Sequence, residues 1–308
     1  MITMITGWPT ALAVALAVTA AIGFAFGALL QQRAVADAAT GGRVGIQSFR
    51  LLARQPRWLA GWATIVASAL LHGVALLLAP VSVVQPIGIL AVPVAVLLAA
   101  RLGRTQPGRT VITGVALAVA GTGAFVLLTG SADRADQPPA TLTGLPTALL
   151  IVAAVTAGLA VVARTRRDLV RCLGYAGIGA VSFGFGSALI HLVGRAVADG
   201  SGLLNPVIVI AGLATATALA LGAWAVQQAY AAGPSAVVVG ALTVVDPLVA
   251  ILLSAGLLGG GLTLAPVVVA AIGISAAVAA VGVRLLASHH PDALPTPQAE
   301  PVRELASV

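Results

Sequence analysis

Asp246 is the residue of this sequence whose type and position most strongly suggest chemistry. It lies about eleven residues, or about 16 Å of helix, into a long apolar stretch. If that stretch spans a membrane, a charged carboxylate there costs at least about 2.5–3.5 kcal/mol, so the side chain must be protonated, paired or turned toward the protein interior. The expected roles are proton coupling, cation binding or recognition of a basic substrate. The alternative is a protonated, hydrogen-bonded structural residue.

Four further polar side chains lie in or at the ends of apolar stretches: His72, Gln85, His191 and Gln227. Histidine can titrate near neutral pH, and an amide at membrane depth either lines a pathway or joins neighbouring helices. For each of these residues a hydrogen bond to a neighbouring helix is the favoured interpretation. A place in a binding or coupling site is the alternative.

Three prolines, Pro86, Pro93 and Pro247, lie inside apolar stretches. Proline lacks an N–H donor and clashes with the carbonyl group four residues earlier. The carbonyls freed in this way would be those of Ser82, Ile89 and Thr243. In lipid, a freed carbonyl is tolerated only against protein, a Ser or Thr hydroxyl, or a water-filled cavity. The prolines therefore predict either broken helices around a transport site or ordinary packing kinks.

The composition excludes a soluble protein. Of 308 residues, 59% are hydrophobic and 8% are charged, whereas soluble domains carry about 25% charged residues. The sequence has no lysine-containing phosphate loop, no HExxH and no CxxC motif, and its single cysteine, Cys172, cannot form an intrachain disulfide. We therefore expect neither an enzyme nor a cofactor, but an all-α, polytopic bundle of transmembrane helices.

Nine stretches are apolar and long enough to cross a membrane, since a span needs about 20 residues. They are Thr10–Leu30, Trp58–Leu78, Val81–Ala100, Thr110–Leu128, Leu145–Ala163, Leu173–Val197, Val207–Gln227, Ser235–Gly256 and Leu264–Leu286. Two flanking segments differ from them. Segment 43–58 is predicted to be an interfacial amphipathic helix or an ordinary basic loop, and the polar, proline-rich tail 287–308 is predicted to be disordered.

The arginines predict the orientation of the chain, because cytoplasmic loops are enriched in basic residues. All sixteen basic residues are Arg, and fourteen of them fall on one side of a nine-span arrangement, in segments 31–57, 101–109 and 164–171 and after the last span. The N-terminus is therefore expected outside and the C-terminus in the cytoplasm, in a multi-pass protein of the cytoplasmic membrane. The net charge of +7 is thus a topology signal, and no nucleic-acid partner is expected.

Two parts of the chain echo each other, and they predict two membrane repeats, 10–163 and 172–286. GFAFG at 23–27 matches SFGFG at 182–186, and the pair Pro80 and Pro93 matches Pro234 and Pro247. The first span would match the sixth, so the repeats would be inverted relative to each other, as in many secondary transporters. The alternative is that apolar, low-complexity sequence matches itself by chance. The spacing of small residues in both motifs also favours close helix packing.

The sequence resembles the drug/metabolite transporter superfamily, with EamA-like repeats. RLLARQPRWLAGW (50–62), LAPVSVVQPIGILAVPVAVLLA (78–99) and QQAYAAGPSAVVVGALTVVDPLVAIL (227–252) look like its branch of NIPA-type magnesium transporters. The resemblance, over residues 10–286, implies a secondary transporter. We expect it to move a small metabolite or drug-like solute by alternating access. The alternatives are a magnesium or other divalent-cation transporter, which needs oxygen ligands, and a non-transporting membrane scaffold. Besides lipid and substrate, a second copy of the chain, forming a homodimer, stays open as a partner.

Overall fold

A computed structural model describes residues 8–39, 43–78, 84, 87–103, 106–130, 141–164, 167–256 and 266–289. Its elements are helices: α1 (Trp8–Ala38), α2 (Ile46–Leu52), α3 (Pro56–Leu78), α5 (Ala91–Gly103), α6 (Arg109–Gly130), α7 (Leu145–Val162), α8 (Asp168–Ala198), α9 (Pro206–Ala232), α10 (Ser235–Gly256) and α11 (Pro266–His289). The predicted all-helical class is confirmed for this part of the chain.

Eight of these helices are long and apolar enough to cross a membrane, which makes the chain a multi-pass membrane protein. The ninth predicted span, 81–100, is described only in part and contributes the shorter apolar helix α5. A ninth crossing is therefore not confirmed. The helices α1 and α8 are longer than predicted, with 31 residues each, so Asp37 and Asp168 are included at their ends.

Proline and asparagine mark where several of the helices begin. Pro56, Pro206 and Pro266 are the first residues of α3, α9 and α11, where the missing N–H has no intrahelical partner to lose. At α9, the Asn205 side chain also accepts a hydrogen bond from the Val207 N–H at 2.9 Å, which caps the helix. The sequence thus sets these boundaries locally.

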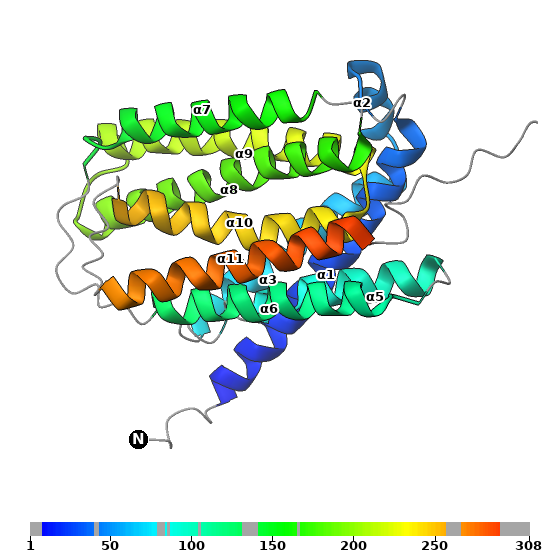
Figure 1. Ribbon diagram of the computed structural model, residues 1–308. Helices are drawn as coiled ribbons and strands as arrows, with labels where there is room; N and C mark the ends of the chain where they lie inside the picture. Colours follow the sequence, from blue (N-terminus) through cyan, green and yellow to red (C-terminus); the bar gives the residue numbers. More distant parts are fainter. Residues whose placement is uncertain are drawn as a thin grey trace, which may run out of the picture.

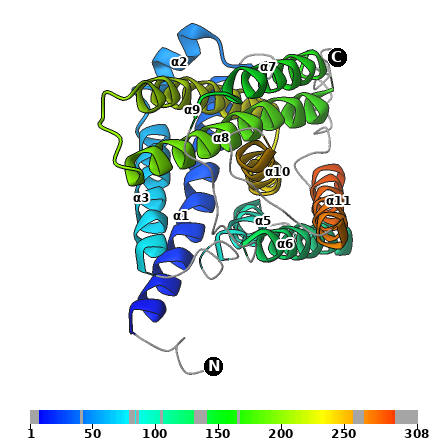
Figure 2. The same ribbon diagram turned by 90° about the vertical axis from the view of Figure 1, so that its left-hand side faces the viewer.

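The helices form one bundle with α10 inside it. Figure 2 shows α10 nearly end-on, with α8 and α9 on one side, α5 and α6 on the other, and α11 beside it. The helix α10 contacts α1, α5, α6, α8, α9 and α11. Three tight pairs surround it, α1 with α3, α8 with α9, and α6 with α11. A side chain on α10 therefore points toward protein on most sides.

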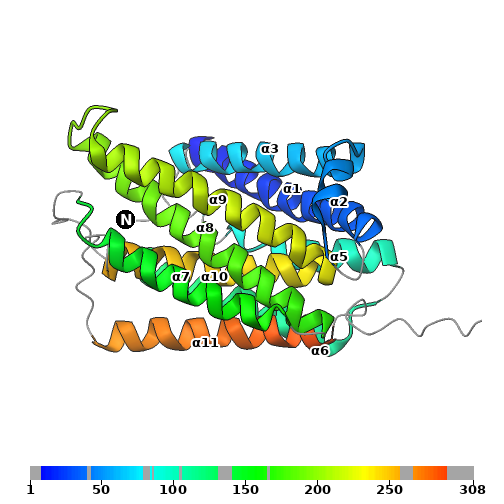
Figure 3. The ribbon, with the colours of Figure 1, turned by 90° about the horizontal axis from the view of Figure 1, so that it is seen from above.

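The bundle has an arginine-rich end. The last residues of α1, α5, α7, α9 and α11 and the first residues of α3, α6, α8 and α10 lie at the right in Figures 1 and 3. This end carries Arg33, Arg43, Arg50, Arg54, Arg57, Arg101, Arg109, Arg164, Arg167, Arg171 and Arg284, whereas Arg195 lies at the other end. Figures 1 and 3 also agree that α1 runs from left to right and α8 from right to left, and that α3 and α9 run in opposite directions as well.

At Pro93 the structure shows a broken helix, which is one of the two alternatives predicted from the prolines. Pro93 lies in the first turn of α5, after a turn at Ile89 and Leu90. The Ile89 carbonyl, expected to be free, accepts a hydrogen bond from the Val92 N–H at 3.1 Å. The chain thus breaks before the proline and reforms the backbone bond locally, whereas Pro247 lies inside a continuous α10.

Segment 43–58 is partly helical, since α2 covers seven of its residues. Leu52 is fully buried while Leu51 is 68% exposed, as expected for a helix with one face against the protein. Gln85, Pro86, Ser82 and Pro80 lie outside the described residues, and so does the predicted tail beyond His289.

Glycines let the helix backbones approach closely. A Cβ at Gly282 of α11 would lie 2.3 Å from the Ala118 nitrogen and 2.6 Å from the Gly114 carbonyl oxygen of α6. A Cβ at Gly27 of α1 would lie 2.9 Å from the Gly61 carbonyl oxygen of α3. This is the small-residue packing that the motif at 23–27 predicted. Without glycine these helix pairs would have to separate.

Replacing Gly282 by alanine is expected to lower the free energy of unfolding by about 1–3 kcal/mol, because the new methyl group meets backbone that cannot yield. Gly273→Ala is the matched control on the same helix, since a Cβ there meets nothing within 4 Å. Its effect should be neutral or slightly stabilising. Thermal unfolding of both purified variants in detergent measures the difference, and equal stability of the two would contradict the packing.

Candidate functional site

Asp246 lies where two cavities of the described part of the chain meet. A cavity of about 330 Å³ extends from it toward the arginine-rich end, and a second of about 370 Å³ lies on its other side. Five residues line both: His72, Gly88, Thr243, Asp246 and Pro247. The Asp246 side chain is half-buried. Its carboxylate therefore lies beside space for water or a solute.

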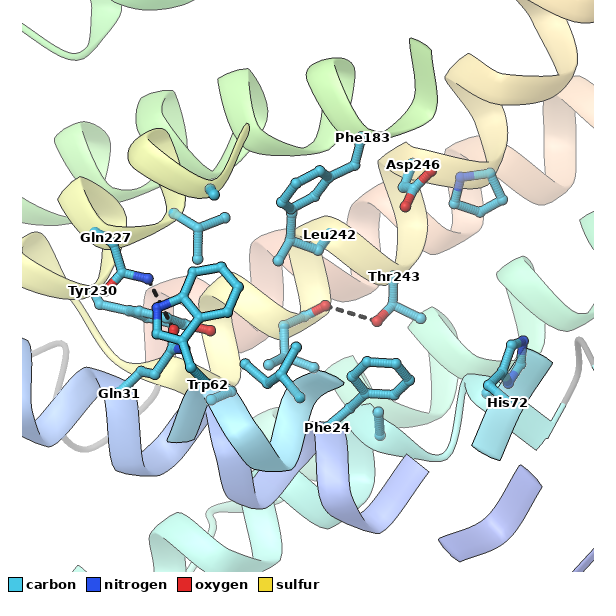
Figure 4. Close-up of a pocket in the computed structure, with 18 residues that line it drawn as sticks. Phe24, Gln31, Trp62, His72, Phe183, Gln227, Tyr230, Leu242, Thr243 and Asp246 are labelled. Atoms are coloured by element: carbon cyan, nitrogen blue, oxygen red, sulfur yellow. Dashed lines mark hydrogen bonds between the residues drawn. The ribbon is translucent and has the colours of Figure 1, made fainter. Parts of the chain in front are cut away.

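Aromatic side chains form the walls of the first cavity. Phe24, Trp62, Phe183 and Tyr230 line it, which is a third of the twelve aromatic residues in the chain. Figure 4 shows Phe183 near Asp246 and Trp62 at the opposite end, next to Gln31 and Gln227. Large ring surfaces with a few polar groups at the ends are typical of small-molecule sites.

Helical periodicity places these lining residues. Trp62, Ile65 and His72 are spaced by three and seven along α3, and Val239, Leu242, Thr243 and Asp246 follow the same periodicity along α10. Residues at such spacing share one face of a helix. The part of α10 that lines the cavity from Val239 to Asp246 is about 10 Å long.

The second cavity is more polar near Asp246. Thr122 and Ser187 line it together with His72 and Thr243. The Ser187 hydroxyl interacts with the Asp246 carboxylate. The Thr122 hydroxyl is buried with no hydrogen-bond partner among the described residues. This side of Asp246 therefore offers oxygen atoms to water or to a coupling ion.

A glycine on α8, Gly184, allows α8 to approach the backbone of α10 closely at Asp246. A Cβ at Gly184 would lie 2.6 Å from the Asp246 backbone oxygen and 2.7 Å from the Val249 Cβ. Because nothing larger fits, α8 lies against α10 at this point, and Ser187, one turn further along α8, reaches the carboxylate. Gly184 belongs to the SFGFG motif, so that motif positions the acidic residue.

Two adjacent glutamines of α9 join the helices at the arginine-rich end of the first cavity. The Trp58 indole N–H donates to the Gln227 Oε1 at 3.0 Å, and the Gln227 Nε2 donates to the Gln31 Oε1 at 2.8 Å. Gln228 binds Val44 twice, accepting from its N–H at 3.0 Å and donating to its carbonyl at 2.8 Å. We call Gln31, Trp58, Gln227, Gln228 and Val44 the amide clasp. The clasp ties α1, α3 and the 43–45 segment to α9.

The structure brings together some of the predicted site residues and separates others. Asp246, His72, Thr243, Pro247 and Gln227 all line the first cavity. Two predicted residues lie elsewhere. His191 has an exposed side chain on α8 and lines neither cavity, and Pro93 lies on α5 outside both.

Sequence reasoning missed the aromatic walls and the two hydroxyl groups of the second cavity. Gln31 was not among the candidate site residues either. A usable signal was present on α3, because Trp58, Trp62, Ile65 and His72 repeat at helical spacing on one face. Without that signal, an aromatic residue in a membrane helix is indistinguishable from an ordinary packing residue.

The arrangement offers a mid-depth carboxylate, aromatic surface and fixed amides, which suits recognition and movement of a solute. Among the described residues no three His, Cys, Asp or Glu side chains gather to hold a metal ion. No protein-family model, curated protein or solved structure matches this chain.

Proposed function

We propose that this protein is a secondary transporter that moves a small, drug-like or metabolic solute across the cytoplasmic membrane by alternating access. The observation that carries the proposal is Asp246, a carboxylate at the middle of a spanning helix with a cavity on each side. Keeping an ionisable group at that depth costs several kcal/mol of insertion free energy, and such groups in membranes mark substrate or ion pathways. Asp246 is the group that binds the solute or its coupling ion.

The proposed architecture is a pair of inverted repeats, with α1, α3, α5 and α6 corresponding to α8, α9, α10 and α11. Three features support it. The helices α1 and α8 run in opposite directions, as do α3 and α9. The tight pair of α1 with α3 recurs as α8 with α9, and α6 packs against its counterpart α11. Transporters built in this way bind their solutes at the repeat interface. In support, α10, which carries Asp246, contacts α1, α5 and α6 of the proposed first repeat.

Alternating access requires that one end of the cavity can be closed while the other is open. The amide clasp lies at the arginine-rich end, and the Phe49, Trp58 and Trp62 rings pack edge-to-face in succession next to it. We assign this end to the cytoplasmic side, following the distribution of arginine. The clasp is then the closed cytoplasmic gate, and opening it requires Gln227 and Gln228 to exchange their partners for water.

Asp246→Asn should abolish coupled transport, because the amide can neither carry a proton nor hold a positive charge. Uptake into vesicles reconstituted with purified protein is screened over a metabolite panel with and without a pH gradient. Flux of the transported solute should fall at least about tenfold in the variant, the loss expected for a hydrogen bond to a charged group. Asp199→Asn, at the exposed end of α8, is the matched control and should transport normally.

The same vesicles distinguish the other functions. Uptake of Mg²⁺ in place of organic solutes would favour a divalent-cation pathway. Folded protein with no flux of any solute, at any pH gradient, would favour a scaffold and would reject the transporter proposal.

Gly184→Ala is expected to reduce flux strongly without touching a titratable group. The added methyl group would push α8 away from the Asp246 backbone and separate Ser187 from the carboxylate, at a cost of about 1–3 kcal/mol in packing. Gly194→Ala on the same helix is the control, since a Cβ there meets nothing within 4 Å. Parallel flux and thermal-unfolding measurements are needed. Equal flux in the two variants would show that the α8–α10 contact does not position the site.

A further inference from the structure

Two buried hydrogen-bond donors at the arginine-rich end of the first cavity have no acceptor among the residues that the structure describes. They are the Nε2 of Gln31, whose side chain is 1% exposed, and the Nε1 of Trp62. Both residues line the cavity, and Figure 4 shows both at the end remote from Asp246. A buried donor left unpaired costs about 1–3 kcal/mol. Two such donors on one cavity wall therefore indicate that something else supplies an acceptor there.

The hydrogen bonds of the amide clasp determine which atom of the Gln31 amide is left unpaired. An indole N–H can only donate, so Trp58 requires the oxygen of Gln227 as its acceptor. The Gln227 amide nitrogen must then donate to Gln31, and the Gln31 amide oxygen accepts this hydrogen bond. The nitrogen of Gln31 is left over as a donor. Reversing any amide in this relay would set two donors or two acceptors against each other.

The charge of the walls selects the kind of acceptor. The described residues that line the first cavity include no arginine, and its only acidic residue is Asp246. A carboxylate or phosphate group placed between Gln31 and Trp62 would be buried without a cationic partner, which is costly. A neutral carbonyl oxygen can accept from both donors without that cost.

We propose that Gln31 and Trp62 form a carbonyl-binding subsite. The solute of this transporter is then a compact molecule with a neutral carbonyl group at one end, an aromatic or apolar body, and a basic nitrogen at the other end. The body lies between Phe24 and Phe183, and the nitrogen reaches Asp246 at the other end of the cavity. This inference rests on the proposed function for the role of Asp246. The two unpaired donors are observed independently of that function.

Equilibrium binding to the full-length protein in detergent tests the subsite with three matched probes. Each is a phenethylamine, carrying at its para position a carboxamide, a carboxylate or an isopropyl group. The carboxamide probe should bind about five- to tenfold more tightly than the other two, the gain expected for one or two neutral hydrogen bonds. Trp62→Phe removes the N–H together with the five-membered ring, so the comparison is between the probes within the variant. The variant should lose the carboxamide preference and bind the carboxamide and isopropyl probes equally.

Binding of the isopropyl probe shows that the variant is folded and supplies the reference affinity for the comparison. Trp224→Phe, on the outer face of α9 where Trp224 is 42% exposed and packs on Tyr175, is the matched control and should keep the carboxamide preference. The subsite is wrong if the wild-type protein binds no probe, shows no carboxamide preference, or keeps that preference in Trp62→Phe. Because no membrane gradient is involved, a carboxamide preference without flux in vesicles would reject the transporter and leave the subsite intact.

Discussion

A carboxyl group at the middle of a hydrocarbon layer is the constraint on which the rest of this structure depends. Asp246 can stay there only if its helix is surrounded by protein and its side chain meets polar atoms or water. The bundle meets both conditions. It places α10 among six other helices, it sets Ser187 beside the carboxylate, and it leaves a cavity on each side.

Close backbone contact makes this arrangement possible in a chain that has few large side chains. Inside a bilayer, apolar packing brings no gain from leaving water, so helices associate through van der Waals contact and hydrogen bonds. Glycines at Gly27, Gly184 and Gly282 bring the helix pairs so near that a single methyl group would clash with backbone. The chain uses its few aromatic rings elsewhere, and four of them line the cavity.

Amide groups complete the site at the arginine-rich end. Gln227 and Gln228 link four separate segments, and the single donor of Trp58 sets the direction of the relay. The relay lies at that end of the cavity and leaves one donor of Gln31 unpaired among the described residues. Gln31 thus belongs to both the proposed gate and the proposed subsite.

The sequence by itself determined the helical class, the apolar stretches, the arginine-rich end and the mid-helix position of Asp246. These features are local, since hydropathy, helix length and proline positions are properties of neighbouring residues. It also predicted the close packing at Gly27. Only the tertiary structure decided that Gly184 touches the backbone of Asp246, that His191 and Pro93 lie outside the cavities, and that the break in the third predicted span precedes Pro93. The Gln31–Gln227 bond joins residues 196 positions apart, and no local pattern specifies which of many similar apolar helix faces will meet at such a distance.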